Sequence, residues 1–145
     1  MPVNLSDMLK KREIEKVEPD RKTADKLLRV SRDAIAAAED NLKMGHNDVA
    51  LSLAYNAMLN AGRAMMSAKG YRAYSETHHK GVVGFCAAVL PSESSQLVAL
   101  FNRYRIRRHE IVYGEIEGGS VGESEAKGAI DKAGELLDLI KQKIS

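Results

Sequence analysis

The sequence predicts an all-α fold, an antiparallel up-and-down bundle of four or five helices with a short extra N-terminal helix. Three observations support this class. Apolar residues recur at helical spacing over most of the chain, short loops separate the periodic segments, and no segment alternates as a half-buried strand does. The length of 145 residues suits one domain. We expect an N-terminal extension over 1–19, with its helix near residues 5–16, and the bundle over 20–145.

The first long helix is expected to begin after Asp20, whose carboxylate can cap its N-terminus. The residues KMGHND break this helix, and Asn47 or Asp48 can cap the next one. Residues 49–68 are rich in Ala, Leu and Met, which favour helix, and Gly70 suits the C-terminal cap. The apolar positions of the first long helix are Leu27, Leu28, Ala34, Ile35, Ala38 and Leu42.

A shorter helix is expected in the middle of the chain. Residues 71–77 are predicted to form a polar loop. The helix then begins at Thr77 or His78 and continues to about Leu90, where Pro91 ends it.

Two further helices complete the chain. One is capped within Ser92 to Ser95 and reaches Tyr113, and the glycine-rich residues EGGSVGES form a turn after it. The last helix has a continuous apolar stripe. This stripe consists of Ala126, Ala129, Ile130, Ala133, Leu136, Leu137, Ile140 and Ile144.

The composition limits the classes of function. With 22 basic and 20 acidic residues the net charge is +2, so a nucleic-acid site must come from local charge. No apolar stretch approaches the roughly 20 residues that cross a bilayer, and the first residues lack the apolar core of a signal peptide. We therefore expect a cytoplasmic protein without membrane contact, with its single Cys86 as a buried thiol.

The fourth helix contains RYRIRRHEIVY, which places an arginine among apolar residues. Arg108 falls near the middle of the apolar arc of this helix. An unpaired guanidinium is costly to desolvate, so Arg108 should meet an acceptor, a second subunit or a ligand. The alternative is a salt bridge across the bundle, or a side chain that extends to water. The arc comprises Leu97, Leu100, Phe101, Tyr104, Ile111 and Val112.

A polar stripe lies beside that arc. Arg105, His109 and Tyr113 follow one another at intervals of four residues, whereas Arg103 and Arg107 project toward the polar side. The second long helix carries another polar stripe, which is either its solvent face or the wall opposite Arg108 and His109. Periodicity does not orient the two helices, so both interpretations stay open. This second stripe consists of Ser52, Asn56, Asn60, Arg63 and Ser67.

The chain resembles the HEPN domains, small all-helical bundle proteins of bacteria and archaea. The resemblance rests on SLAYNAMLNAGRAMMSAKGYRAY, HHKGVVGF and RYRIRRHEIVYG, and it spans nearly the whole chain. The family's hallmark is an arginine, a polar residue, three variable residues and a histidine, which in nuclease members form a metal-independent RNA-cleaving site, usually where two subunits meet. The resemblance implies that Arg108 takes the arginine position, His109 the polar position and Tyr113 the final histidine position.

Tyr113 departs from the family pattern. Histidine, with a pKa of about 6.5, exchanges protons at neutral pH, whereas tyrosine, at about 10, is a poor general base. Members without the final histidine resemble binding partners. The family is commonly paired with a minimal nucleotidyltransferase, as toxin with antitoxin or as substrate-holding subunit with enzyme.

Our main interpretation is a homodimeric nucleotide- or RNA-binding module that works with a nucleotidyltransferase partner. Arg105 and Arg108 would contact phosphate, because the arginine fork matches phosphate oxygens. His109 and Tyr113 would supply hydrogen bonds or base stacking. Further candidate contacts are Asn56, Asn60 and Arg63 of the polar stripe and the loop pair Tyr71 and Arg72.

Two alternatives belong to other classes of protein. One is a metal-independent RNase toxin, with His109 as base, Arg108 as phosphate clamp and Tyr113 as a weak acid. The other is a structural or interaction bundle without a nucleic-acid ligand. Tyr113 is also a candidate for modification on its hydroxyl. For the loop pair, the simpler interpretation is that Tyr71 packs beneath the loop and Arg72 is solvated.

No cofactor or metal is expected. His78 and His79 are adjacent and point to different faces of a helix, and no further ligands accompany them at zinc spacing. The glycine-rich segment lacks the Gly-Lys-Ser/Thr ending of a phosphate-binding loop.

Overall fold

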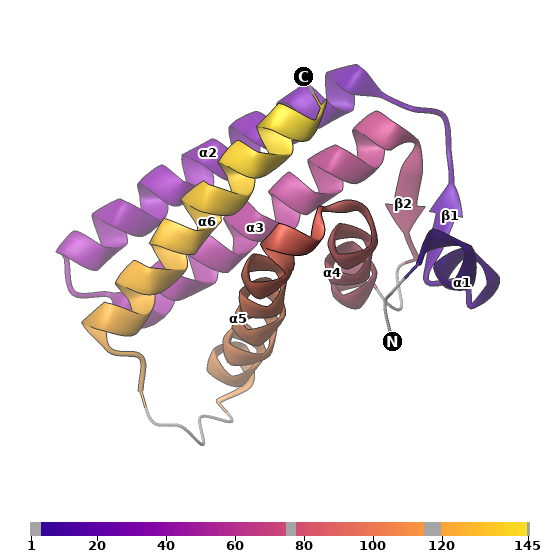
Figure 1. The fold of residues 1–145 in the computed structure, drawn as a ribbon. Coiled ribbons are helices and arrows are strands. Elements are labelled where there is room, and N and C mark those ends of the chain that lie inside the picture. The colour runs from indigo at the N-terminus through magenta and orange to yellow at the C-terminus, as the bar shows by residue number, and fades with distance from the viewer. Residues whose placement is uncertain (1–3, 75–77, 115–119, 145) are drawn as a thin grey trace.

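The computed structural model describes residues 4–74, 78–114 and 120–144, and the predicted all-α bundle is confirmed. Two very short strands and one 3-10 turn accompany the helices (Figure 1). The helices are α1 (Leu5–Lys10), α2 (Arg21–Lys43), α3 (Asn47–Lys69), α4 (His78–Val89), α5 (Ser95–Tyr113) and α6 (Glu123–Ile144); the strands are β1 (Ile14–Lys16) and β2 (Tyr71–Ala73); the turn is η2 (Ser92–Ser94).

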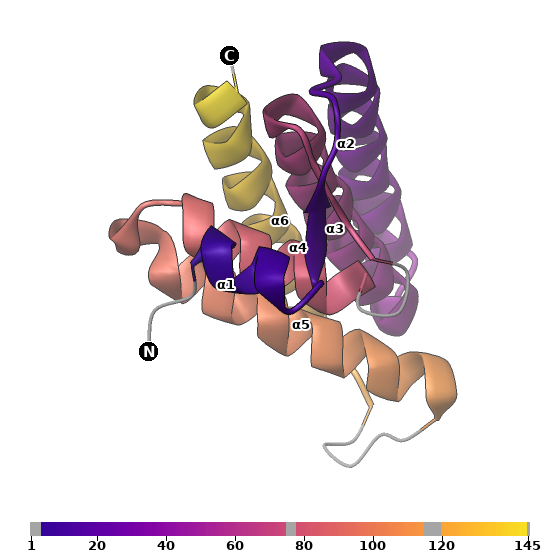
Figure 2. The same cartoon turned by 90° about the vertical axis from the view of Figure 1, so that its right-hand side faces the viewer.

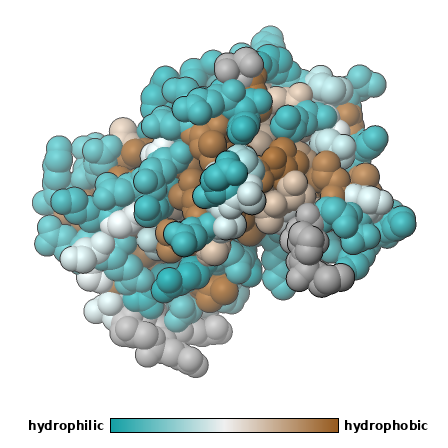
Figure 3. Space-filling view, in the orientation of Figure 1, coloured by the Kyte–Doolittle hydropathy of each residue, from teal (hydrophilic) through white to brown (hydrophobic). Residues whose placement is uncertain are grey.

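The helix α3 lies at the centre of the fold. It packs along α2 and α6, which lie beside it in Figure 1, and it also contacts α4 and α5. Its alanines at every third or fourth position leave room for these neighbours, and larger side chains such as Leu51, Tyr55 and Met58 fill the space between them. Hydrophilic residues cover much of the face that Figure 3 shows, and hydrophobic residues reach the surface near its centre.

The helices α4 and α5 cover α3 on another side. Figure 2 shows α5 crossing the long helices, with its C-terminal half extending beyond α4. The three helices meet at Gly62, where an added Cβ would stand 2.5 Å from Val82 Cγ1, 3.2 Å from Cys86 Sγ and 3.8 Å from Phe101 Cε2. Cys86 is fully buried, as expected, and burial raises the pKa of its thiol to about 12.

The N-terminal segment is attached to the bundle by a small antiparallel sheet. Ile14 of β1 pairs with Ala73 of β2, and Ile14 and Met8 are buried in the common core. The predictions of a loop over 71–77 and of no strand are therefore wrong for β2, and the short helix predicted near 5–16 ends at Lys10. Three-residue strands are too short to show alternation, and each is stabilised by a partner distant in the sequence.

Most helix ends follow the local signals. The Asp20 carboxylate accepts the Thr23 N–H at 2.9 Å, and Gly70 caps α3 with φ 86°. The predicted caps at Asn47 or Asp48 are wrong, because His46 precedes α3 without a side-chain cap bond. Among the helices of the described residues, none is both long and apolar enough to span a bilayer.

Gly62→Ala should destabilise the protein by about 1–3 kcal/mol, because the stiff, β-branched Val82 side chain has no free space beside the new methyl group. Gly134→Ala is the matched control, since an added Cβ there would meet no neighbouring group within 4 Å and alanine favours helix, so it should stabilise by roughly 0.5–1 kcal/mol. Urea unfolding of both variants measures the difference. Equal stabilities would show that α3 and α4 are less tightly packed than described.

Candidate functional site

Arg108 lies between α5 and the core, as its place in the apolar arc predicts. Its Nε atom is buried and has no hydrogen-bond partner, and its Cζ atom lies 5.9 Å from the centre of the Tyr55 ring. This contact suits a cation–π interaction, which stabilises the charge without neutralising it. The salt bridge considered for Arg108 is absent among the described residues.

Tyr55 connects Arg108 to the start of α4. The Tyr55 hydroxyl lies 2.8 Å from His79 Nδ1, and the two rings are stacked with centroids 5.7 Å apart. Tyr55 is fully buried, and desolvation raises the pKa of its hydroxyl above the usual value. The hydroxyl therefore stays protonated and can donate a hydrogen bond to the unprotonated Nδ1 of a neutral His79.

Five basic side chains gather here from three helices. We call them the basic cluster: Arg63 of α3, His78 and His79 of α4, and Arg105 and Arg108 of α5. Burial lowers the pKa of His79, and the charges of Arg108, His78, Arg105 and Arg63 lower it further. Burial and Arg63 likewise lower the pKa of His78. Among the described residues, the charges that shift the pKa of these two rings are all those of basic side chains.

The cluster arginines are held by neutral groups. Arg63 Nη1 donates to Asn60 Oδ1 at 3.1 Å, and Arg105 Nε donates to Asn102 Oδ1 at 2.9 Å. An amide oxygen orients a guanidinium without cancelling its charge. Within 4–74, 78–114 and 120–144, no carboxylate forms an ion pair with any of the three cluster arginines. The cluster therefore keeps a concentrated positive charge.

Only part of the polar stripe of α3 belongs to the basic cluster. The charge of Arg63 lowers the pKa of both cluster histidines, and a hydrogen bond to Asn60 orients its side chain. Asn60 also donates to the Asn56 backbone carbonyl at 2.9 Å, so Asn56 supports the arrangement through its main chain. The sequence interpretation missed Tyr55 and discounted the His78–His79 pair, whose position at the start of a helix was its only signal.

His109 and Tyr113 lie apart from Arg108, on the outer face of α5. Their ring centroids are 4.5 Å apart, and Tyr113 is 66% exposed.

Two expectations for this helix are wrong. Val112 is 51% exposed, because α5 extends beyond the core, and the Arg107 side chain is only 12% exposed. Arg107 forms a bidentate pair with Glu125 of α6, at 2.9 and 3.1 Å.

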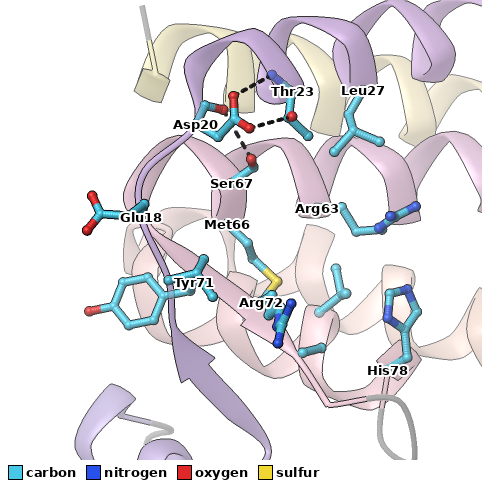
Figure 4. A pocket seen from close by; sticks show the side chains of 13 residues that line it. Glu18, Asp20, Thr23, Leu27, Arg63, Met66, Ser67, Tyr71, Arg72 and His78 are labelled. Carbon is cyan, nitrogen blue, oxygen red and sulfur yellow. Dashed lines mark hydrogen bonds between the residues drawn. The ribbon is translucent and has the colours of Figure 1, made fainter.

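A cavity of about 510 Å³ lies next to the basic cluster (Figure 4). Arg63 and His78 belong to both, and the predicted loop pair, Tyr71 and Arg72, also lines the cavity. The Tyr71 ring packs on Phe85 with centroids 5.3 Å apart, while Arg72 pairs with Glu15 on β1. Among the described residues, no three His, Cys, Asp or Glu side chains gather as a metal site would require.

Comparison with models of known protein families matches residues 24–143 to the HEPN domain. The matched region runs from the first turn of α2 almost to the end of α6, and it contains the whole basic cluster. Comparison with curated protein sequences found no match.

The two cluster histidines make stability depend on pH. Their pKa values are lowered in the folded protein, so the unfolded chain binds protons first as the pH falls. The free energy of unfolding should therefore decrease as the pH falls through the ordinary histidine value of about 6.5. Urea unfolding at several pH values between about 7.5 and 5.5 tests this.

His79→Gln should reduce the slope of stability against pH, since one desolvated ring is removed. His46→Gln is the matched control, because His46 is exposed and lies outside the cluster. Identical slopes for the unmodified protein and His79→Gln would contradict the assignment.

Proposed function

The chain belongs to the HEPN domain family, and from this premise we propose that it binds RNA or nucleotides through the basic cluster. One observation carries the proposal: Arg108 has a buried, unpartnered Nε within a group of basic side chains that no described carboxylate neutralises. Leaving such a donor unsatisfied costs about 1–3 kcal/mol, and the rest of the side chain is partly exposed, so its charge is available to a phosphate.

Phosphate is the ligand group that best complements this arrangement. Guanidinium groups offer paired donors that match phosphate oxygens, and Arg105 and Arg108 lie on one helix opposite Arg63 of another. The neutral His79 ring accepts a hydrogen bond from the Tyr55 hydroxyl at Nδ1, and its other nitrogen carries a hydrogen that it can donate to a ligand. The cluster thus supplies charge and oriented hydrogen bonds together.

His109 and Tyr113 supply an exposed aromatic surface on α5, the helix that also carries Arg105 and Arg108. Their rings are in contact with each other and open to solvent. Exposed rings of this kind stack unpaired bases of single-stranded RNA. We therefore assign phosphate recognition to the arginines and base contact to this ring pair.

We also propose that the protein is a homodimer that associates through the outer face of α5. Ile106 and Tyr113 lie seven residues apart on one face of this helix and are 48% and 66% exposed. Clustered exposed apolar residues favour association, and a two-fold axis would bring two copies of the same helix together. The paired helices would then present both ring pairs in one groove.

The cellular context follows from the family resemblance. We propose a nucleotidyltransferase as protein partner, in a toxin–antitoxin or defence setting in the cytoplasm, with this chain as the binding subunit. We retain the division into an extension over 1–19 and a HEPN bundle over 20–145.

Cleavage of RNA is the second candidate function, favoured by the contact between His109 and Tyr113 at the family's motif positions. Cleavage requires a base and a phosphate clamp on the same phosphate. Within one protomer Arg108 faces Tyr55 while His109 is exposed, which favours binding over cleavage.

Arg108→Ala should weaken the binding of a short fluorescent single-stranded RNA roughly tenfold to a hundredfold, because a hydrogen bond to a charged group contributes about 1.5–3 kcal/mol. Arg103→Ala removes the same charge from an exposed position of the same helix and should change affinity much less. Fluorescence anisotropy in EDTA at two salt concentrations measures both variants.

Three results of this experiment separate the alternatives. Arg108-dependent binding without cleavage supports the proposal. Arg108-dependent cleavage in EDTA would make the protein a metal-independent RNase despite Tyr113. Neither binding nor cleavage would leave a structural bundle.

Ile106→Asp should convert the dimer to a monomer at micromolar concentration, because a carboxylate would be buried in an apolar contact. Val30→Asp, at another exposed apolar position, on α2, is the control and should leave the dimer intact. Sedimentation velocity distinguishes the two species. An unmodified protein that sediments as a monomer would overturn this part of the proposal.

A further inference from the structure

The cavity beside the basic cluster has walls of two opposite chemical kinds. It lies between the start of α2, the C-terminal half of α3, β2 and the start of α4 (Figure 4). Its volume of about 510 Å³ is in the range of small-molecule sites. Basic side chains line one part, and Asp20 with the hydroxyl residues Thr23 and Ser67 lines another.

The basic part consists chiefly of Arg63 and His78. Figure 4 shows the two side chains facing each other. Arg63 uses one nitrogen for Asn60, and its remaining donors have no ion-pair partner among the described residues. Arg72 also lines the cavity, but Glu15 pairs with it. Arg63 and His78 are therefore the groups available to an anion.

The opposite part is built around Asp20. Its carboxylate accepts the Thr23 N–H at 2.9 Å and the Thr23 hydroxyl at 2.7 Å, and these bonds lower its pKa. A carboxylate has about four acceptor positions, so others remain for a ligand. The Ser67 hydroxyl donates to the Asp20 backbone carbonyl at 3.1 Å, which ties this group to α3. Ionised carboxylates in nucleotide sites commonly accept ribose hydroxyls.

The spacing of the two parts follows from α3. Arg63 and Ser67 are four residues apart on one face of this helix, so their backbones are about one turn, roughly 5–6 Å, apart, and the bond to Asn60 directs the Arg63 guanidinium further from Ser67. A ribose that carries a 5′-phosphate is long enough to extend over at least this backbone separation. Leu27, Met66 and Val82 add apolar surface to the lining of the cavity, against which a flat ring can pack.

We infer that this cavity binds a ribonucleotide bearing a terminal phosphate, with the phosphate on Arg63 and His78 and the ribose hydroxyls on Asp20. The ligand is a free mononucleotide or the phosphorylated end of an RNA, which share this chemistry. The site goes beyond the proposed RNA contact because it does not involve Arg108, although Arg63 and His78 are common to both.

Isothermal titration calorimetry with AMP, GMP, adenosine and inorganic phosphate tests the inference on the full chain. A nucleotide should bind at least about tenfold more tightly than adenosine or phosphate alone, since each of these contacts only part of the cavity. Anisotropy with matched 5′-phosphate and 5′-hydroxyl RNAs distinguishes the two sources. A preference for the phosphorylated RNA, without binding of AMP or GMP, assigns the site to RNA ends.

Variants separate this site from the one at Arg108. Arg63→Ala should lower AMP affinity about tenfold or more, whereas Arg103→Ala, which removes an exposed arginine outside the cavity, should leave it unchanged. Asp20→Asn keeps the helix cap but removes the carboxylate charge, and should weaken binding of AMP more than that of its 2′,3′-dideoxy analogue. Circular dichroism confirms folding of each variant.

Two results would overturn the inference. One is equal affinity for phosphate and nucleotide, and the other is no nucleotide binding together with no preference for phosphorylated RNA. Neither affects the Arg108-dependent RNA binding, which is measured separately with 5′-hydroxyl RNA.

Discussion

At Gly62, α3 has no side chain on the face that meets α4, and Val82 and Cys86 occupy the space that a Cβ would need. This contact brings the first turn of α4 to α3, so His79 can reach the buried Tyr55 hydroxyl. Phe101 packs at the same point and positions α5, whose later turns carry Arg105 and Arg108. The basic cluster therefore exists because three helices converge on one residue without a side chain.

The helices were predictable because their signals are local. A carboxylate at Asp20, a glycine at Gly70 and Pro91 after α4 mark helix ends within a few residues of themselves. The pairing of β1 with β2 has no such signal, since each strand has three residues and its partner is more than fifty residues away. Arg107 is a second example. The helical wheel placed its side chain on the polar side, but its burial depends on the position of Glu125 in the next helix.

The same distinction between local and long-range signals applies to the candidate site. The position of Arg108 within an apolar arc is a property of one helix, and the sequence was sufficient to mark it as unusual. Its contact with Tyr55, and the contact of Tyr55 with His79, depend on how three helices are rotated about their axes. Periodicity contains no information on that rotation. The sequence around the histidine pair at 78 and 79 therefore gave no sign of the arginines that surround it in the fold.

Part of the cavity wall comes from a segment that lies outside the family match. The family match begins at residue 24, yet Val17, Glu18 and Asp20 line the cavity from the segment before it, which is fastened to α3 by the bonds Val17 N–H to Gly70 O and Asp20 N–H to Ser67 O. Both bonds join main-chain atoms, so the attachment of this segment to α3 does not depend on its side chains. Substitutions at Val17 or Glu18 can therefore change the lining of the cavity without changing how the segment is attached.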